Sequence, residues 1–157
     1  MLNDGMVNGW THDDLAWAFL EGKWRAIVSW LTRKPNTLLA FDAIRQQLPL
    51  KGQHDAGFQV VPIDRIIGST GRCGEFDRAF CPRRLVNFAR WISISQAYRQ
   101  GIRLPPVELY KVGSAYFVKD GHHRISVARA SGQDFIDSYV TEIETAADWA
   151  PEVKPTT

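Results

Sequence analysis

The first third of the chain carries apolar residues every three or four positions, the spacing that collects them on one side of an α-helix. One stripe predicts a helix that begins at Thr11 and ends before Pro35. A second stripe predicts a helix over 37–48, which Pro49 ends. Residues 10–50 are therefore expected to form a helical extension, followed by a linker over 51–57. The two stripes consist of Leu15, Phe19, Trp24, Ile27, Val28 and Leu31, and of Leu38, Phe41, Ile44 and Leu48.

From Phe58 onward, short β-rich segments alternate with helical ones. The segment from Ile67 to Phe80 reads as a glycine-containing loop, and the next helix is predicted to open at Cys81-Pro82 and end at Gly101. Gly113-Ser114 separates two predicted strands by two residues, which is typical of a β-hairpin. Strands are predicted over 58–61, 107–112, 115–118 and 135–143, and a further helix over 121–130.

This order of elements predicts an α/β (α+β) fold in which a small mixed sheet of about four or five strands is flanked by helices. We expect a single domain over 1–157, with the helical extension at 10–50 and the core at 58–143. The composition agrees, because 157 residues with 45% hydrophobic and 23% charged residues are typical of one globular domain.

Charge and cysteine content narrow the possible partners. The net charge of +2 is too small to indicate nucleic acid by itself, although a local basic patch stays possible. Cys73 and Cys81 have no second pair with which to complete a zinc site. The N-terminus lacks a basic start followed by an apolar segment, and no apolar run approaches the roughly 20 residues of a membrane span. We expect a cytoplasmic protein with no membrane association, and the sequence leaves its oligomeric state open.

The strongest chemical signal is the segment Asp120-Gly121-His122-His123-Arg124, hereafter the box, between a predicted strand and a predicted helix. The first turn of a helix has unpaired N–H groups and a partial positive charge, so it attracts anions. Two histidines and an arginine are unfavourable there for the helix alone, and a bound phosphate would explain them. Gly121, His122, His123 and Arg124 are the predicted phosphate ligands. Asp120 is a candidate Mg²⁺ ligand. The alternative is that Asp120 only caps the helix and the histidines are ordinary structural residues.

A second cluster of basic residues lies upstream, in the predicted loop and the start of the next helix: Arg72, Arg78, Arg83 and Arg84. Arg72 and Arg78 are candidate contacts to substrate or phosphate. Glu75 and Asp77 lie between them, and a phosphotransferase needs a carboxylate that accepts the proton of the acceptor hydroxyl. Both are therefore candidate catalytic residues. Alternatively, these charges form a weak, solvated surface network.

Residues 58–143 resemble the ParB/sulfiredoxin superfamily, above all in the stretch from Leu104-Pro105-Pro106 through the box to Ala128. The resemblance implies a nucleotide-binding core. Sulfiredoxin has a reactive cysteine after the box glycine, where this chain has His122, so sulfinic acid reduction by that mechanism is not expected. Chromosome-partitioning ParB has Gly-Glu-Arg-Arg in the box and further DNA-binding and dimerisation domains, so a complete DNA clamp is not expected either.

The free serine kinases of the superfamily have an Asp-Gly-His-His-Arg box similar to the one in this chain. That resemblance implies that His123 and Arg124 hold phosphates, that His123 belongs to the catalytic set, and that Glu75 is the base. We therefore expect a nucleotide-dependent phosphotransferase or nucleotide hydrolase that acts on a small molecule and uses Mg²⁺ with ATP, ADP or CTP.

Two alternatives from other functional classes stay open. One is a nucleotide-sensing module without turnover, which would lack a carboxylate within reach of the terminal phosphate. The other is a DNA-binding regulator that uses the N-terminal helices as a helix-turn-helix. Arg45 is the only cation of the second helix, a weak feature for contact with DNA phosphates.

Overall fold

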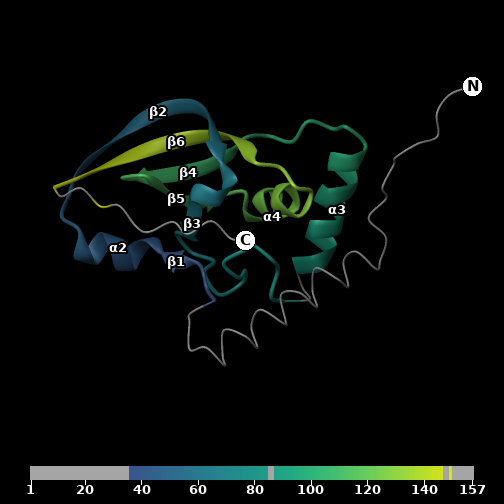
Figure 1. Ribbon diagram of the computed structural model, residues 1–157, viewed down its shortest axis with the longest axis horizontal. Helices are drawn as coiled ribbons and strands as arrows, with labels where there is room; N and C mark the ends of the chain where they lie inside the picture. The colour runs from purple at the N-terminus through teal and green to yellow at the C-terminus, as the bar shows by residue number, and fades with distance from the viewer. Residues whose placement is uncertain (1–35, 85–86, 147–148, 150–157) are drawn as a thin grey trace, which may run out of the picture.

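The computed structural model describes residues 36–84, 87–146 and 149, which form a mixed sheet of six strands with helices packed against it (Figure 1). This confirms the expected fold class, with more strands than expected. The predicted helix from Thr11 to Pro35 and the tail after Ala150 lie outside the described residues. In chain order the elements are β1 (Leu39–Ala40), α2 (Phe41–Gln47), β2 (Leu50–Pro62), the 3₁₀ turn η1 (Ile63–Arg65), β3 (Ile66–Ser69), α3 (Phe88–Arg99), β4 (Val107–Val112), β5 (Ala115–Asp120), α4 (His122–Ala130) and β6 (Phe135–Thr145).

The strands lie in the order β1-β3-β5-β4-β6-β2. The first three are parallel to one another, β4 is antiparallel to β5 and parallel to β6, and β2 is antiparallel to β6. Because β3 and β5 are parallel neighbours, with Ser69 beside Val118, their C-terminal ends reach the same edge of the sheet. The loop after Ser69 and the box after β5 are therefore brought together.

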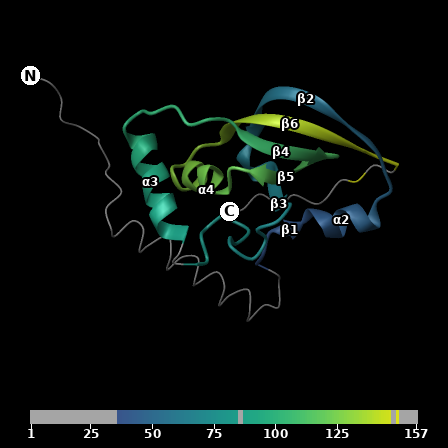
Figure 2. The same ribbon diagram turned by 180° about the vertical axis from the view of Figure 1, so that it is seen from behind.

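Successive side chains of the central strands point to opposite faces of the sheet. In β5, Tyr116 and Val118 pack in the same cluster as Ile125 of α4, whereas Phe117 packs with Phe41 of α2. The sheet therefore has α4 on one face and α2 on the other. Helices α3 and α4 lie side by side, at the opposite end of the sheet from α2 (Figures 1 and 2).

Two strand predictions are corrected by the structure. The expected linker over 51–57 belongs to β2, which pairs with β6 as far as Leu50 opposite Thr145. This segment lies in an edge strand with mostly exposed side chains, so polar residues are tolerated where a buried strand would need apolar ones. The expected loop over 67–80 begins with three residues of β3. Position 68 of this strand requires glycine, because a Cβ there would overlap the Phe117 ring and the Leu39 carbonyl oxygen.

Two helix starts are also corrected. Helix α2 begins at Phe41 instead of residue 37, because Leu39–Ala40 pairs with β3 as a short strand. Helix α3 begins at Phe88 instead of Cys81-Pro82. Pro82 forms an isolated bridge with Phe76, and the Arg83 amide donates to the Glu75 carbonyl oxygen, so this segment folds back as a loop.

The remaining elements follow the prediction closely. The β4–β5 hairpin turns at Gly113-Ser114, and β6 covers the predicted strand with two further residues. Helix α3 is followed by Gly101 at φ +71°, and α4 by Gly132 at φ +75°. In both cases two backbone amides beyond the helix bond back to its last carbonyl groups, as in a Schellman motif.

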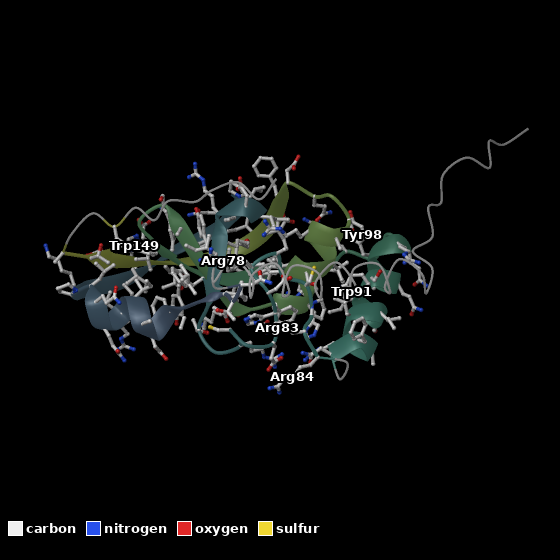
Figure 3. The ribbon with its side chains drawn as sticks, turned by 60° about the horizontal axis from the view of Figure 1, so that its bottom comes forward. Arg78, Arg83, Arg84, Trp91, Tyr98 and Trp149 are labelled. Atoms are coloured by element: carbon white, nitrogen blue, oxygen red, sulfur yellow. The ribbon has the colours of Figure 1, made fainter. Side chains whose placement is uncertain are left out.

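Helices α3 and α4 are tied to the loop that precedes them. Ser126 Oγ of α4 accepts a hydrogen bond from Trp91 Nε1 of α3 at 2.9 Å and donates one to the Phe80 carbonyl oxygen. All three residues are buried, and Figure 3 shows Trp91 on α3. This link fixes α3 against the helix that carries the box. Within the described part of the chain, no helix is long and apolar enough to span a membrane.

Candidate functional site

The box forms the turn between β5 and α4, and Gly121 makes that turn possible. Gly121 is the residue before the first helical position, at φ +105° and ψ 24°, where a side chain would be strained. A Cβ at this position would also lie 2.5 Å from Val107 Cγ1. The backbone therefore passes close to β4 and enters α4 directly. No side chain caps this end of α4, so the sequence alternative in which Asp120 is the cap is not borne out.

A cavity of about 380 Å³ opens beside this turn. Its wall combines three separate segments: the box with Lys119, the loop 70–72 after β3, and Arg90 and Ile94 of α3. The wall carries four cationic side chains, Arg72, Arg90, Lys119 and Arg124, against a single carboxylate, Asp120. It is thus a cavity suited to an anion at the N-terminus of a nine-residue helix.

His122 is held by contacts with two buried residues, Ser69 and Phe76. Its Nε2 lies 2.6 Å from Ser69 Oγ, and its ring stacks on Phe76 at a centroid distance of 5.7 Å. Burial is the main reason that the pKa of His122 is lowered to about 4, and the positive charge of Arg72 adds to the effect. The imidazole is therefore neutral at physiological pH, and the cavity's positive charge comes from its arginines and lysine.

His123 is 95% buried (5% exposed) and packs edge-on against the same Phe76 ring, with centroids 5.2 Å apart. Its Nε2 is buried and has no hydrogen-bond partner among the described residues. Burial lowers the pKa of His123 as well, with Arg90 as the next cause. A buried ring nitrogen without a partner costs stability, and His123 is one of the residues that line the cavity.

Arg124 is engaged within the protein. Its Nη1 donates to the carbonyl oxygens of Pro105 and Pro106, each at 2.7 Å, and its Nη2 forms an ion pair with Asp120 Oδ2 at 2.6 Å. The side chain is only 16% exposed. Arg124 therefore fastens the segment before β4 to the box. A substitution of Arg124 would disturb this anchor, so the loss of ligand binding in such a variant would not by itself locate a phosphate.

A scan against protein-family models gives no match, and a search of curated proteins gives none. Among solved structures, the chain is similar to sulfiredoxin from Arabidopsis thaliana, at 17% sequence identity and a TM-score of 0.40, over 53% of this chain and 82% of that one. The likeness is to the sulfiredoxin fold. At this identity and TM-score it carries no information about family or activity.

Of the two candidate bases on the upstream loop, Glu75 contacts Arg72 of the cavity wall. Glu75 Oε2 lies 3.7 Å from Arg72 Nη1 and accepts a hydrogen bond from Asn87 Nδ2 at 3.1 Å. Its negative charge acts on both box histidines by raising their pKa, against the larger effect of burial. Glu75 is not itself part of the wall.

Asp77 has a structural position. It is 1% exposed, and its Oδ1 accepts hydrogen bonds from the Ala79 and Cys81 amides at 2.8 and 2.9 Å. These bonds hold the tight turn between the buried rings of Phe76 and Phe80. Like Glu75, Asp77 does not line the cavity.

The other upstream arginines also lie outside the cavity wall. Arg78, Arg83 and Arg84 are exposed on the loop before α3, where Figure 3 shows them. Arg83 and Arg84 precede the helix by several residues, so the sequence argument from an unfavourable helix end does not apply to them. Of these four arginines, Arg72 alone lines the cavity.

A metal ion could use few protein ligands here. Asp120 is the one carboxylate of the wall, and Arg124 already engages its Oδ2. Among the described residues, no group of three or more histidine, cysteine, aspartate or glutamate side chains could hold a metal ion. Asp120 is therefore the one carboxylate of the wall that could contact a metal ion.

Sequence reasoning missed four residues that shape the site: Ser69, Phe76, Arg90 and Lys119. Lys119 is adjacent to the box and could have been included. The other three reach the box only through the fold, since Ser69 lies 53 residues from His122 along the chain. Only the parallel pairing of β3 with β5 reveals that contact.

Proposed function

We propose that this protein binds the phosphate groups of a nucleotide in the cavity beside the box. The observation that carries the proposal is a cavity wall with four cationic side chains and one carboxylate, which includes His123, whose buried Nε2 has no hydrogen-bond partner among the described residues. Free backbone N–H groups of the first turn of α4 add donors for phosphate oxygens. Arg72, Arg90 and Lys119 would supply the charge, while the neutral histidines supply directional hydrogen bonds.

We further propose that the bound nucleotide, with Mg²⁺, serves a phosphoryl transfer or hydrolysis reaction on a small molecule with a hydroxyl group. Such reactions depend mainly on positioning and on neutralising phosphate charge, and both are functions that this wall could perform. Glu75 is the better candidate for the base. Its carboxylate contacts Arg72 of the wall, whereas the Asp77 carboxylate is buried in a turn and takes two backbone amides.

One observation favours a second candidate, a nucleotide-sensing module without turnover. Glu75 already accepts a hydrogen bond from Asn87 and lies outside the cavity wall. Replacement of Glu75 by Gln distinguishes the two functions. It should leave nucleotide affinity near the wild-type value in both cases. It should remove turnover only if Glu75 is the base, so measurable wild-type turnover that survives in Glu75→Gln would rule out this role.

Calorimetric titration of ATP, ADP, CTP and GTP, with and without Mg²⁺, tests the binding site itself. We expect one nucleotide to bind with a stoichiometry of about one, and Arg90→Ala to weaken binding about tenfold through the loss of a charged hydrogen bond. Arg84→Ala is the matched control, because Arg84 is an exposed arginine outside the wall. Equal losses of nucleotide affinity in Arg90→Ala and Arg84→Ala, or no binding by any nucleotide, would contradict the proposal.

A further inference from the structure

The buried hydroxyl group of Ser69 contacts His122, one of the two histidines of the box. Ser69 is fully buried at the end of β3, and its Oγ makes contacts with two segments of the site. It accepts hydrogen bonds from the Gly71 and Arg72 amides, each at 3.3 Å, and lies 2.6 Å from His122 Nε2. One atom thus connects the loop of the cavity wall to the histidine of the box.

The hydrogen-bond capacity of Ser69 decides where the proton of His122 lies. A serine hydroxyl has two acceptor sites and one proton. Two amides already donate to Oγ, so a further donation from His122 Nε2 would place three donors on its two acceptor sites. The Ser69 proton has two possible acceptors, His122 Nε2 at 2.6 Å and the Val118 carbonyl oxygen at 3.5 Å, and the shorter contact is much the stronger. Nε2 therefore accepts, and the neutral ring carries its own proton on Nδ1.

We infer that Ser69 is a positioning residue that holds His122 in the Nδ1–H tautomer, so that the ring offers a fixed donor to an anionic ligand in the cavity. The same hydroxyl fixes the amides of Gly71 and Arg72, and both residues line the wall. Stacking on Phe76 prevents the ring from turning over freely. The inference rests on the proposed function for the nature of the ligand, and on hydrogen-bond geometry alone for the tautomer.

Nitrogen NMR of the ligand-free protein tests the tautomer directly. In ¹⁵N-labelled wild-type protein at pH 7.5, we expect a protonated, pyrrole-type Nδ1 and an unprotonated, pyridine-type Nε2 at His122. In Ser69→Ala we expect the Nε2–H form to appear. A wild-type ring protonated at Nε2, or an unchanged ring in Ser69→Ala, would overturn the inference. This readout needs no ligand, so it holds or fails independently of the proposed nucleotide.

Ligand affinity tests the consequence, with ATP and pyrophosphate as probes. Ser69→Ala should weaken binding about tenfold, the effect of one misdirected hydrogen bond. Ser69→Cys keeps a similar side-chain volume but has a weak S–H donor, so it should behave like Ser69→Ala. Wild-type affinity in Ser69→Cys would show that Ser69 has a packing role only.

Ser138→Ala is the control, since Ser138 is equally buried and its Oγ donates to the Ile136 carbonyl oxygen outside the cavity wall. Wild-type protein that shows the expected tautomer but binds neither probe would refute the proposed function and leave the tautomer assignment standing.

Discussion

At the scale of single residues, the box is defined by what each side chain does rather than by its formal charge. Gly-His-His-Arg in a first helical turn suggests three cations, yet both histidines are held neutral by burial, and Arg124 is bound to two carbonyl oxygens and Asp120. Arg90, which forms no ion pair among the described residues, is contributed to the cavity wall by α3. The sequence placed the box between a strand and a helix, as the structure has it, and could not assign these roles, because burial and partners are set by distant segments.

The lowered pKa of His122 predicts a loss of stability in acid. The pKa is about 4 in the folded protein against 6.5 in the unfolded chain, so between these values the unfolded state binds more protons. The free energy of unfolding should therefore fall as pH decreases from 6.5, by up to about 3 kcal/mol near pH 4 from this group. Urea unfolding of wild type and His122→Gln at pH 7 and pH 4.5 measures it. The stability difference between the two proteins should shrink in acid, and parallel pH profiles would disprove the assignment.

Gly121 should be one of the least replaceable glycines of the described chain. Gly121→Ala adds a Cβ at φ +105°, where strain costs about 1–2 kcal/mol, and drives it against Val107, where overpacking costs about 1–3 kcal/mol more. Gly132→Ala, at φ +75° with nothing within 4 Å, should cost the strain alone. Gly74→Ala has neither problem. Chemical denaturation of the three variants should rank them in that order, and equal losses at Gly121 and Gly132 would remove the steric part of the argument.

At the scale of elements, the sequence predicted best where local signals and the fold agree. The β4–β5 hairpin and α4 have a two-residue turn, a glycine before the helix and Gly132 after it, and all were found in place. The failures share one cause, which is tertiary pairing that overrides local composition. Polar residues 51–57 became part of β2 because β6 is there to pair with them, and Pro82 was drawn into a loop by Phe76 rather than into a helix.

The contact between α3, α4 and the upstream loop predicts a large effect of one hydroxyl group. Ser126→Ala would remove two buried hydrogen bonds, one from Trp91 Nε1 and one to the Phe80 carbonyl oxygen, which should cost roughly 2–4 kcal/mol of unfolding free energy. Ser131→Ala is the control, because its Oγ donates to the Val127 carbonyl oxygen at the partly exposed end of the same helix. Urea denaturation measures both. A loss below about 1 kcal/mol in Ser126→Ala would mean that water or a rearranged side chain replaces the lost bonds.

At the scale of the whole molecule, the fold class was predictable and the site was only half predictable. The box is a continuous stretch of sequence, and its strand–turn–helix context can be recognised locally. The opposite side of the cavity comes from Arg72 after β3 and Arg90 in α3, which no local pattern joins to the box. Glu75 and Asp77 show the same limit, since one of these two carboxylates contacts Arg72 of the wall and the other accepts hydrogen bonds from the amides of a buried turn.

A cavity with walls from three separate segments exists only while the chain is folded. Any molecule that fills it therefore binds the native state and not the unfolded chain, and so shifts the folding equilibrium by mass action. The fraction of the protein that has ligand in the cavity therefore affects how long the protein survives. In a cell that lacks the ligand, the same chain would be unfolded more often and degraded sooner. Because the ligand stabilises the folded state, the abundance of the protein would then follow the supply of that ligand.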